Sequence, residues 1–350
     1  MKTIIHRVDI TKIDNNIIND AAKTIQEGGL VAFPTETVYG IGANALESNA
    51  VSKIYTAKGR PSDNPLIVHV SDKEDVKKYV KHIGDNAKKL MDEFWPGPLT
   101  LIFEKKDIIP DSITGGLSTV AIRIPSHNIA REIIRVANRP VAAPSANVSG
   151  RPSPTMAKHV ISDLDGKIDM IIDGGDCEIG LESTVVDVTE KIPTILRPGG
   201  ITRNMIEQVI GHITIDPAIK PSGEKLIPKS PGMKYRHYAP NADLIVVKGE
   251  SKEVVEHINN LVIEKKKQGK KVGVIATNQT KDEYTCENII VIGDRFNSEE
   301  IAANLFKVLR EFDEIEVDNI YCEAFSNKDL GTATMNRLLK AAGNKIVDLR

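Results

Sequence analysis

Apolar runs of strand length alternate with stretches of helical periodicity over the first 210 residues. Residues 17–27, IINDAAKTIQE, repeat apolar side chains at helical spacing and end at Gly28-Gly29, which predicts a helix and its stop. Residues 48–58, SNAVSKIYTAK, predict a second helix after a polar turn. Strands are predicted at the apolar runs 30–34, 66–70, 99–103, 120–125, 141–145, 170–175, 183–188 and 194–199. Their irregular spacing, with Gly-, Pro- and Ser-rich loops between them, predicts a mixed twisted α/β sheet with flanking helices.

The alternation becomes regular beyond residue 240. Strands are predicted at 243–249, 271–277, 288–294 and 319–325, and helices at 251–268, 298–312 and 332–342. Strands separated by helices of this length predict a smaller parallel α/β (Rossmann-like) domain.

Residues 211–240 differ from both neighbours. They hold five prolines and 5 Lys/Arg against 2 Asp/Glu, whereas 1–210 hold 25 against 27 and 241–350 hold 16 against 19. A proline-rich stretch with few apolar residues is typical of an extended linker. The chain is therefore divided into a candidate catalytic domain at 1–210, a basic proline-rich linker at 211–240 that is expected to act as a lid, and a C-terminal α/β domain at 241–350.

Composition narrows the class of protein. The net charge of −2 argues against a general polyanion binder, and 4% aromatic residues argue against base stacking along a single strand. Three cysteines (Cys177, Cys286 and Cys322) lie far apart, which fits a reducing compartment better than a zinc or disulfide framework. No apolar run suits a signal peptide or a membrane span. We expect a soluble, cytoplasmic protein without membrane association.

The sequence Gly40-x-Gly42-x-x-Ala45 matches a dinucleotide-binding fingerprint. This fingerprint normally follows an apolar strand directly, but the residues before Gly40 include Thr35, Glu36 and Thr37. Dinucleotide binding is therefore not favoured. The same residues, with Tyr39, follow a predicted strand and could read the polar groups of a small ligand. The competing interpretation is a threonine-rich turn that caps the next helix.

Residues 58–70, KGRPSDNPLIVHV, collect polar side chains before a strand. Lys58 and Arg60 are two residues apart where Pro61 requires an extended chain, so both cations can point toward one anion. Asn64 precedes the strand, and His69 alternates with core positions inside it. Taken one at a time, these residues are more often solvated charges or, for the histidine, a hydrogen-bonded core residue. The four together predict a binding site.

Arg123 lies inside an apolar strand, where an unpaired guanidinium is costly. Either a carboxylate of the protein neutralises it, or it receives a ligand carboxylate. Further hydroxyls, amides and one cation follow other predicted strands, at Ser145, Asn147, Ser149, Ser153, Ser183, Thr184 and Arg197. No Ser–His–Asp or Cys–His set is evident. This combination predicts a site that binds and orients anions without a covalent protein nucleophile.

Several of these segments together resemble the threonylcarbamoyl-adenylate synthase family in its long two-domain form. The matching stretches are FPTETVYGIGANA, KGRPSDNPLIVHV, WPGPLT, VAIRIPSH, APSANVSGRPSPT, GLESTVVD, LRPGG and the linker motif SPGMKYRHYAP. The pairs Lys58/Arg60 and Ser145/Asn147 are hallmarks of that family.

The resemblance implies that L-threonine, bicarbonate or CO₂, and ATP give threonylcarbamoyl-AMP and pyrophosphate. This is the first step of a tRNA adenosine modification that a separate transferase complex completes. Lys58 and Arg60 would act on the reacting anions, and Mg²⁺ would accompany ATP without dedicated protein ligands. The implied threonine residues are Thr37, His69, Arg123, Ala143 and Ser183. The implied ATP residues are Arg60, Asn64, Thr119, Ser145, Asn147, Ser153, Arg197 and Tyr235.

The implied reaction agrees with the residue pattern, because the threonine carbamate is itself the nucleophile and the enzyme needs only positioning and charge neutralisation. Two alternatives remain at this stage. One is an RNA-binding or ribosome-associated module, which would want a broad basic face instead of a pocket. The other is a carbamoyl-transfer domain of the hydrogenase-maturation type, whose zinc-finger and acylphosphatase-like segments this chain does not show. No stable contact with nucleic acid is expected.

Overall fold

A computed structural model describes residues 2–219 and 237–349. Within these ranges the contacts define two compact units. The first unit comprises 2–149 and 153–219, and the second comprises 150–152 and 237–349. Most of the predicted linker, including Tyr235, lies outside the described residues, so the boundaries at 211 and 240 stay predictions.

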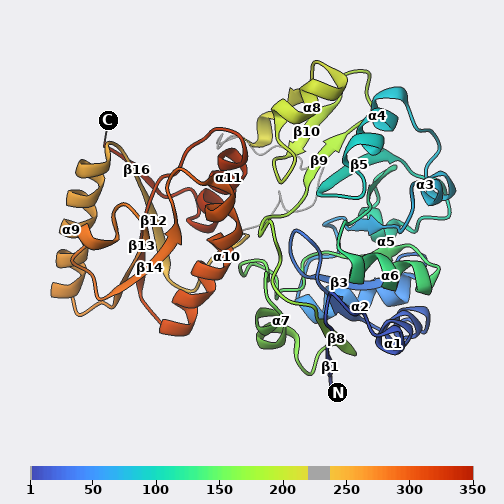
Figure 1. Cartoon of the computed structure of the whole chain (residues 1–350), viewed down its shortest axis with the longest axis horizontal. Coiled ribbons are helices and arrows are strands. Elements are labelled where there is room, and N and C mark those ends of the chain that lie inside the picture. The colour runs from blue at the N-terminus through green and yellow to red at the C-terminus, as the bar shows by residue number, and fades with distance from the viewer. Residues whose placement is uncertain (1, 220–236, 350) are drawn as a thin grey trace. The chain divides into compact units, whose positions relative to one another are not determined.

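The first unit is built on one mixed sheet (Figure 1). Its described strands run in the spatial order β1 (Ile4–Arg7), β8 (Met170–Asp173), β2 (Val31–Phe33), β3 (Gly40–Asn44), β7 (Val141–Ala142), β4 (Ile67–His69), β6 (Thr119–Arg123), β5 (Leu99–Glu104), β9 (Thr184–Asp187), β10 (Thr194–Arg197) and β11 (Thr214–Ile215). The sheet contains both parallel pairs such as β4–β6 and antiparallel pairs such as β5–β6. The predicted mixed sheet is confirmed.

Helices lie outside this sheet. They are α1 (Asn15–Gln26), α2 (Ser48–Lys58), α3 (Lys73–Tyr79), α4 (Asp85–Phe94), α5 (Asp111–Thr114), α6 (Asn128–Ala137), α7 (Ala157–Leu164) and α8 (Arg203–Ile210), followed by the 3₁₀ turn η1 (Pro217–Ile219). The predicted helix at 48–58 matches α2, which ends at Gly59 in the left-handed conformation (φ 59°) that glycine adopts without strain.

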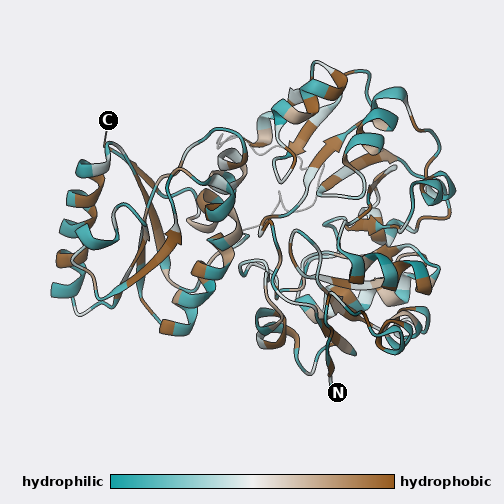
Figure 2. Ribbon diagram, viewed as in Figure 1, coloured by the Kyte–Doolittle hydropathy of each residue, from teal (hydrophilic) through white to brown (hydrophobic). Residues whose placement is uncertain are grey.

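Strand alternation divides the first unit's core between the two faces of the sheet. Val31 and Phe33 of β2 pack with α1 and α6 on one face, while Ala32 belongs to a larger cluster with α2, α4 and α7 on the other. Figure 2 shows the apolar colours concentrated on the strands and on one side of the helices. A third, smaller apolar cluster lies on strands β4 to β10 and consists of Ile67, Ile102, Ala121, Val185 and Leu196.

The second unit has a parallel five-stranded sheet among its described residues. The spatial order is β14 (Asn288–Gly293), β13 (Val272–Thr277), β15 (Asn319–Glu323), β12 (Asp243–Lys248) and β16 (Ile346–Asp348). All pairs in it are parallel. Its other elements are α9 (Ser251–Lys267), η2 (Lys281–Glu283), α10 (Ser298–Ile315) and α11 (Leu330–Ala341). The predicted parallel α/β domain is confirmed.

Four strands carry no apolar pattern that predicts them. Residues 40–44 were expected to be a turn but form β3, and β1, β11 and β16 are short edge strands with mostly exposed side chains. Glycine is usually depleted in strands. In β3 it is required, because a Cβ on Gly42 would lie 2.6 Å from a ring carbon of Phe33 on the paired strand β2.

No helix among the described residues has both the length and the apolar character that a membrane span requires.

Candidate active site

Polar side chains gather on one face of the first unit's sheet. Strand alternation turns Ile122 and Val68 toward the large core cluster, and turns Arg123 and His69 toward the face that carries Ile67 and Ala121. His69 and Arg123 are register partners on the parallel strands β4 and β6. The site therefore has an apolar floor and is formed by the face of the sheet.

Arg123 is at the centre of this site and is 4% exposed. Its Nη1 donates to Thr37 Oγ1 at 2.9 Å, and its Nε donates to the carbonyl oxygen of Gly97 at 3.2 Å. Its Nη2 lies 2.7 Å from Oε1 of Glu36, which is also buried. Of the two alternatives that the sequence left open, the structure shows a protein carboxylate beside the guanidinium.

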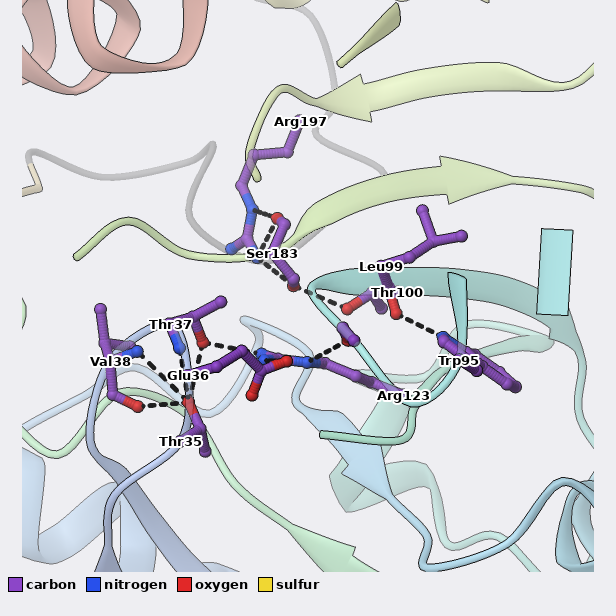
Figure 3. Close-up of polar contacts among 11 residues, drawn as sticks. Thr35, Glu36, Thr37, Val38, Trp95, Leu99, Thr100, Arg123, Ser183 and Arg197 are labelled. Atoms are coloured by element: carbon purple, nitrogen blue, oxygen red, sulfur yellow. Dashed lines mark hydrogen bonds and ion pairs between the residues drawn. The ribbon is translucent and has the colours of Figure 1, made fainter. Parts of the chain in front are cut away.

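The loop 34–39 after β2 presents Glu36 and Thr37 to Arg123 (Figure 3). Thr35 holds this loop in shape, because its Oγ1 contacts Thr37 Oγ1 at 2.8 Å and donates to the carbonyl of Val38 at 2.7 Å. A local side-chain-to-backbone bond of this kind fixes a turn without regular secondary structure. The threonine-rich segment is therefore both a turn and part of the site.

Burial, and then the positive charge of Arg123, lowers the pKa of His69 from 6.5 to about 3. His69 is 3% exposed, and its Nδ1 has no hydrogen-bond partner among the described residues. The imidazole is consequently neutral near pH 7. It adds no second positive charge next to Arg123.

Ser183 links the same face to Arg197. Its Oγ contacts Thr100 Oγ1 at 2.7 Å, and Arg197 donates from Nη2 to that Oγ at 3.1 Å and to the Ser183 carbonyl at 2.9 Å (Figure 3). Gly199 makes this approach possible, because a Cβ there would lie 2.4 Å from backbone atoms of residues 182–184. The GLEST and LRPGG segments thus meet at one point.

Lys58 and the loop 145–149 form a second polar group. Lys58 Nζ donates to the carbonyl oxygens of Ser145 and Asn147, the second at 2.5 Å, and the Lys58 carbonyl accepts from the Ser149 N–H at 2.8 Å. Ser145 Oγ donates to Asn147 Oδ1 at 2.5 Å. The Lys58 side chain is buried at the end of α2, so its charge holds this loop against the helix.

The other predicted site residues belong to neighbouring segments. Arg60 donates to the Pro65 carbonyl at 3.2 Å, Asn64 is buried and its amide nitrogen has no hydrogen-bond partner among the described residues, and the Ala143 N–H donates to the Ile67 carbonyl at 3.0 Å. Ser153 Oγ donates to Glu182 Oε1 at 2.6 Å. Thr119 begins β6 at partial burial.

Sequence reasoning missed two residues that the structure brings into these contacts. Thr100 lies in an apolar strand with no feature that marks it, and only the pairing of β5 with β9 brings it to Ser183. Glu182 Oε1 accepts the hydrogen bond of Ser153 Oγ, although the two residues are 29 positions apart in the sequence. Glu36 was noticed as part of a polar turn, but its pairing with Arg123 was not predicted.

Comparison with known proteins follows the same division of the chain. Residues 23–199 match the Sua5_yciO_yrdC family, described as "Telomere recombination", and residues 201–343 match Sua5_C, described as "Threonylcarbamoyl-AMP synthase, C-terminal domain". The threonylcarbamoyl-AMP synthase of Pyrococcus abyssi is 52% identical over 96% of this chain and 97% of its own length. The chain belongs to the threonylcarbamoyl-AMP synthase family.

Other members of the threonylcarbamoyl-AMP synthase family support the two-domain form. The Bacillus subtilis protein is 48% identical over 99% of this chain and 100% of its own length. The crystal structure of Pyrococcus abyssi Sua5 in complex with L-threonine superposes with a TM-score of 0.94, at 51% identity over 99% of this chain and 100% of that chain. The resemblance found in the sequence, to the long form of the family, is confirmed.

Proposed function

We propose that this chain joins L-threonine, bicarbonate or CO₂, and ATP to form threonylcarbamoyl-AMP and pyrophosphate. The observation that carries the proposal is the buried Arg123, whose guanidinium lies beside Glu36 and Thr37 over an apolar floor. Full-length relatives named threonylcarbamoyl-AMP synthase support it. The activity makes the product that a separate transferase complex uses in tRNA modification.

The threonine would bind on the face that carries Arg123. A planar guanidinium suits a carboxylate, and its charge is worth more on a buried face than in water. Thr37, neutral His69 and Ser183 would then surround the threonine side chain and backbone. Because His69 is uncharged near pH 7, Arg123 remains the positive group that orients the substrate carboxylate.

ATP would bind beside the loop 145–149. Lys58 fixes this loop through the carbonyls of Ser145 and Asn147, which brings its ammonium group close to the Ser145 hydroxyl and the Asn147 amide. A cation beside hydroxyl and amide groups is a common way to hold phosphates. Arg60, Asn64, Thr119, Ser153 and Arg197 are the further ATP residues of this proposal, and Tyr235 would join them from outside the described residues.

The chemistry needs no protein nucleophile. Threonine and bicarbonate give a carbamate, and a carbamate oxygen attacks the α-phosphorus of ATP while pyrophosphate leaves. Positioning and charge neutralisation are the contributions that phosphoryl transfer generally requires from a protein. Lys58 and Arg60 are proposed to supply part of that neutralisation.

ATP is proposed to enter as its magnesium complex. Mg²⁺ is usually held by substrate phosphates, water and at most one or two carboxylates. Within residues 2–219 and 237–349 no three His, Cys, Asp or Glu side chains form a group suited to a metal ion. Lys58 and the loop 145–149 supply a cation, hydroxyls and an amide, which suit phosphate oxygens better than a metal ion. A carboxylate, that of Asp163, also contacts this loop and accepts from the Val148 N–H at 3.1 Å.

We further propose that the enzyme works in the cytoplasm.

Mass spectrometry of a reaction that contains L-threonine, bicarbonate and Mg-ATP tests the proposal. The expected products are threonylcarbamoyl-AMP and an equal amount of pyrophosphate, each dependent on both threonine and bicarbonate. Pyrophosphate release with ATP alone, or serine fully replacing threonine, would overturn it.

A further inference from the structure

The structure leaves the carboxylate of Glu36 with unused bonding capacity in the middle of the proposed threonine site. Glu36 is 5% exposed, and neither of its carboxylate oxygens accepts a hydrogen bond among the described residues. Its contact with the protein is the ion pair with Arg123 at 2.7 Å. Buried carboxylates ordinarily accept several hydrogen bonds, so this group is available to a donor that the described residues do not supply.

We infer that Glu36 is the base that removes a proton from the α-ammonium group of threonine. The inference rests on the proposed function, because it assigns the substrate ammonium as the missing donor. A threonine carboxylate bound at Arg123 places the α-ammonium one carbon away from that carboxylate. A side chain that contacts the same guanidinium is then within reach of the ammonium.

Charge supports this arrangement. Two carboxylates at one guanidinium, those of Glu36 and of threonine, repel each other unless a positive group lies between them. The ammonium is such a group. When its proton moves to Glu36, the repulsion disappears and the amine gains the lone pair that it needs as a nucleophile.

The step balances as follows. Glu36 carboxylate, threonine ammonium and bicarbonate give protonated Glu36, the threonine carbamate and one water molecule. The N–C bond forms from the amine lone pair, the bicarbonate C–OH bond breaks, and the ammonium proton ends on a Glu36 oxygen. The site carries the same total charge before and after.

Three other groups face Glu36 or act on its charge. They are Arg123 on β6, His127 at the start of α6 and Cys177 in the loop after β8. Burial lowers the pKa of His127 and raises the pKa of Cys177. Both are neutral near pH 7, so neither supplies a charge that replaces that of Glu36.

Glu36→Gln tests the inference, because it keeps the side-chain shape and removes the base. In the forward direction, threonine- and bicarbonate-dependent pyrophosphate release at pH 7 is expected to fall at least about 100-fold. In the reverse direction, ATP formation from fresh threonylcarbamoyl-AMP and pyrophosphate is expected to stay within about threefold of the parent, because that step precedes any proton transfer to the amine.

The pH profile gives a second measurement. The parent uses the abundant threonine zwitterion, whereas Glu36→Gln depends on the minor free amine. Forward turnover of the variant is therefore expected to rise about tenfold per pH unit between pH 7 and 8.5, more steeply than that of the parent. Glu36→Asp, which keeps a carboxylate, should recover part of the forward rate.

Glu323→Gln is the matched control, since it removes another buried glutamate that pairs with an arginine, Arg295. It should change neither direction of the reaction nor the pH slope. Equal losses in both directions for Glu36→Gln, or a slope equal to that of the parent, would show that Glu36 only supports Arg123 and would overturn the inference. A parent enzyme with no threonine-dependent product would instead overturn the proposed function.

Discussion

Two buried glutamates, one in each unit, form ion pairs with arginines in different surroundings. Glu323, at the end of β15 in the second unit, pairs with Arg295, and its Oε1 also accepts hydrogen bonds from Thr280 Oγ1 at 2.6 Å and from Thr277 Oγ1 and N at 3.2 Å. Glu36 in the first unit has its ion pair with Arg123 and no hydrogen-bond donor among the described residues.

This difference distinguishes an ion pair whose carboxylate already accepts hydrogen bonds from the protein from one whose carboxylate can still accept them from a ligand. A buried charge is tolerated when hydrogen bonds compensate its lost hydration, and Thr277 and Thr280 provide that compensation for Glu323. Glu36 lacks it, although it is as deeply buried. Two of the four experiments below test this contrast directly, and two test other contacts of the first unit; they are ordered by the size of the expected effect.

The largest effect is expected for Arg123→Ala. The change leaves Glu36 as an unpaired buried charge, which should lower the free energy of unfolding by about 3–5 kcal/mol. Loss of the carboxylate contact should raise the threonine KM by a factor corresponding to about 2–4 kcal/mol, with a smaller change in kcat. Denaturant unfolding and steady-state kinetics measure the two effects.

Arg295→Ala is the control for this experiment. It should also destabilise the protein, because it leaves Glu323 without its cation, but the threonine KM should not change. A folded Arg123→Ala variant with the parent's threonine KM would remove Arg123 from the threonine site.

The next effect is expected for Lys58→Ala. Its Nζ holds the carbonyls of Ser145 and Asn147, and loss of charged hydrogen bonds costs about 1.5–3 kcal/mol. Here the loss should appear mainly in kcat, because the loop that positions the phosphates is released. Lys53→Ala is the matched control on the same helix: Lys53 donates to the Gly28 carbonyl at 2.7 Å, and its removal should leave turnover unchanged. Equal turnover for both variants would contradict the assignment of Lys58.

A smaller effect, on stability alone, is expected for Glu323→Gln. The amide keeps an acceptor for Thr277 and Thr280 but loses the charge that pairs with Arg295, so the unfolding free energy should fall by about 1–2 kcal/mol. Thermal or urea unfolding measures it. A change in threonine KM together with unchanged stability would invalidate the distinction between the two ion pairs.

The smallest effect is a pH dependence that originates at His69. Its pKa is about 3 in the folded protein and 6.5 as the ordinary value, so the unfolded chain binds the proton more readily. The stabilisation is therefore fully present above pH 6.5 and is lost as the pH falls toward 3, by at most about 1.4 kcal/mol per pH unit. Urea unfolding at pH 7 and pH 6, an interval over which the expected loss is about 0.7 kcal/mol, should show a smaller difference in His69→Gln than in the parent. An identical difference would show that His69 does not contribute.

Apart from the edge strand β16, the strands and α-helices of the second unit were predictable because their pattern is local. Each apolar run is bounded by a helix with its own periodicity, and the observed elements follow the predicted ranges within a few residues. In the first unit β3 was missed, because its two glycines and Asn44 are poor strand formers taken alone. Its place in the sheet depends on the ring of Phe33, which fills the space left by Gly42.

The sequence by itself determined the two-unit α/β fold, the positions of Lys58, Arg60, His69 and Arg123 beside predicted strands, and the resemblance to the family. These features depend on spacing along the chain, which the sequence contains. Only the tertiary structure decided that Glu36 lies at Arg123, that Thr100 reaches Ser183, and that Lys58 holds the loop 145–149. The physical reason is that each of these contacts joins residues 80 or more positions apart, so their partners are chosen by strand order and burial and leave no periodic trace in the sequence.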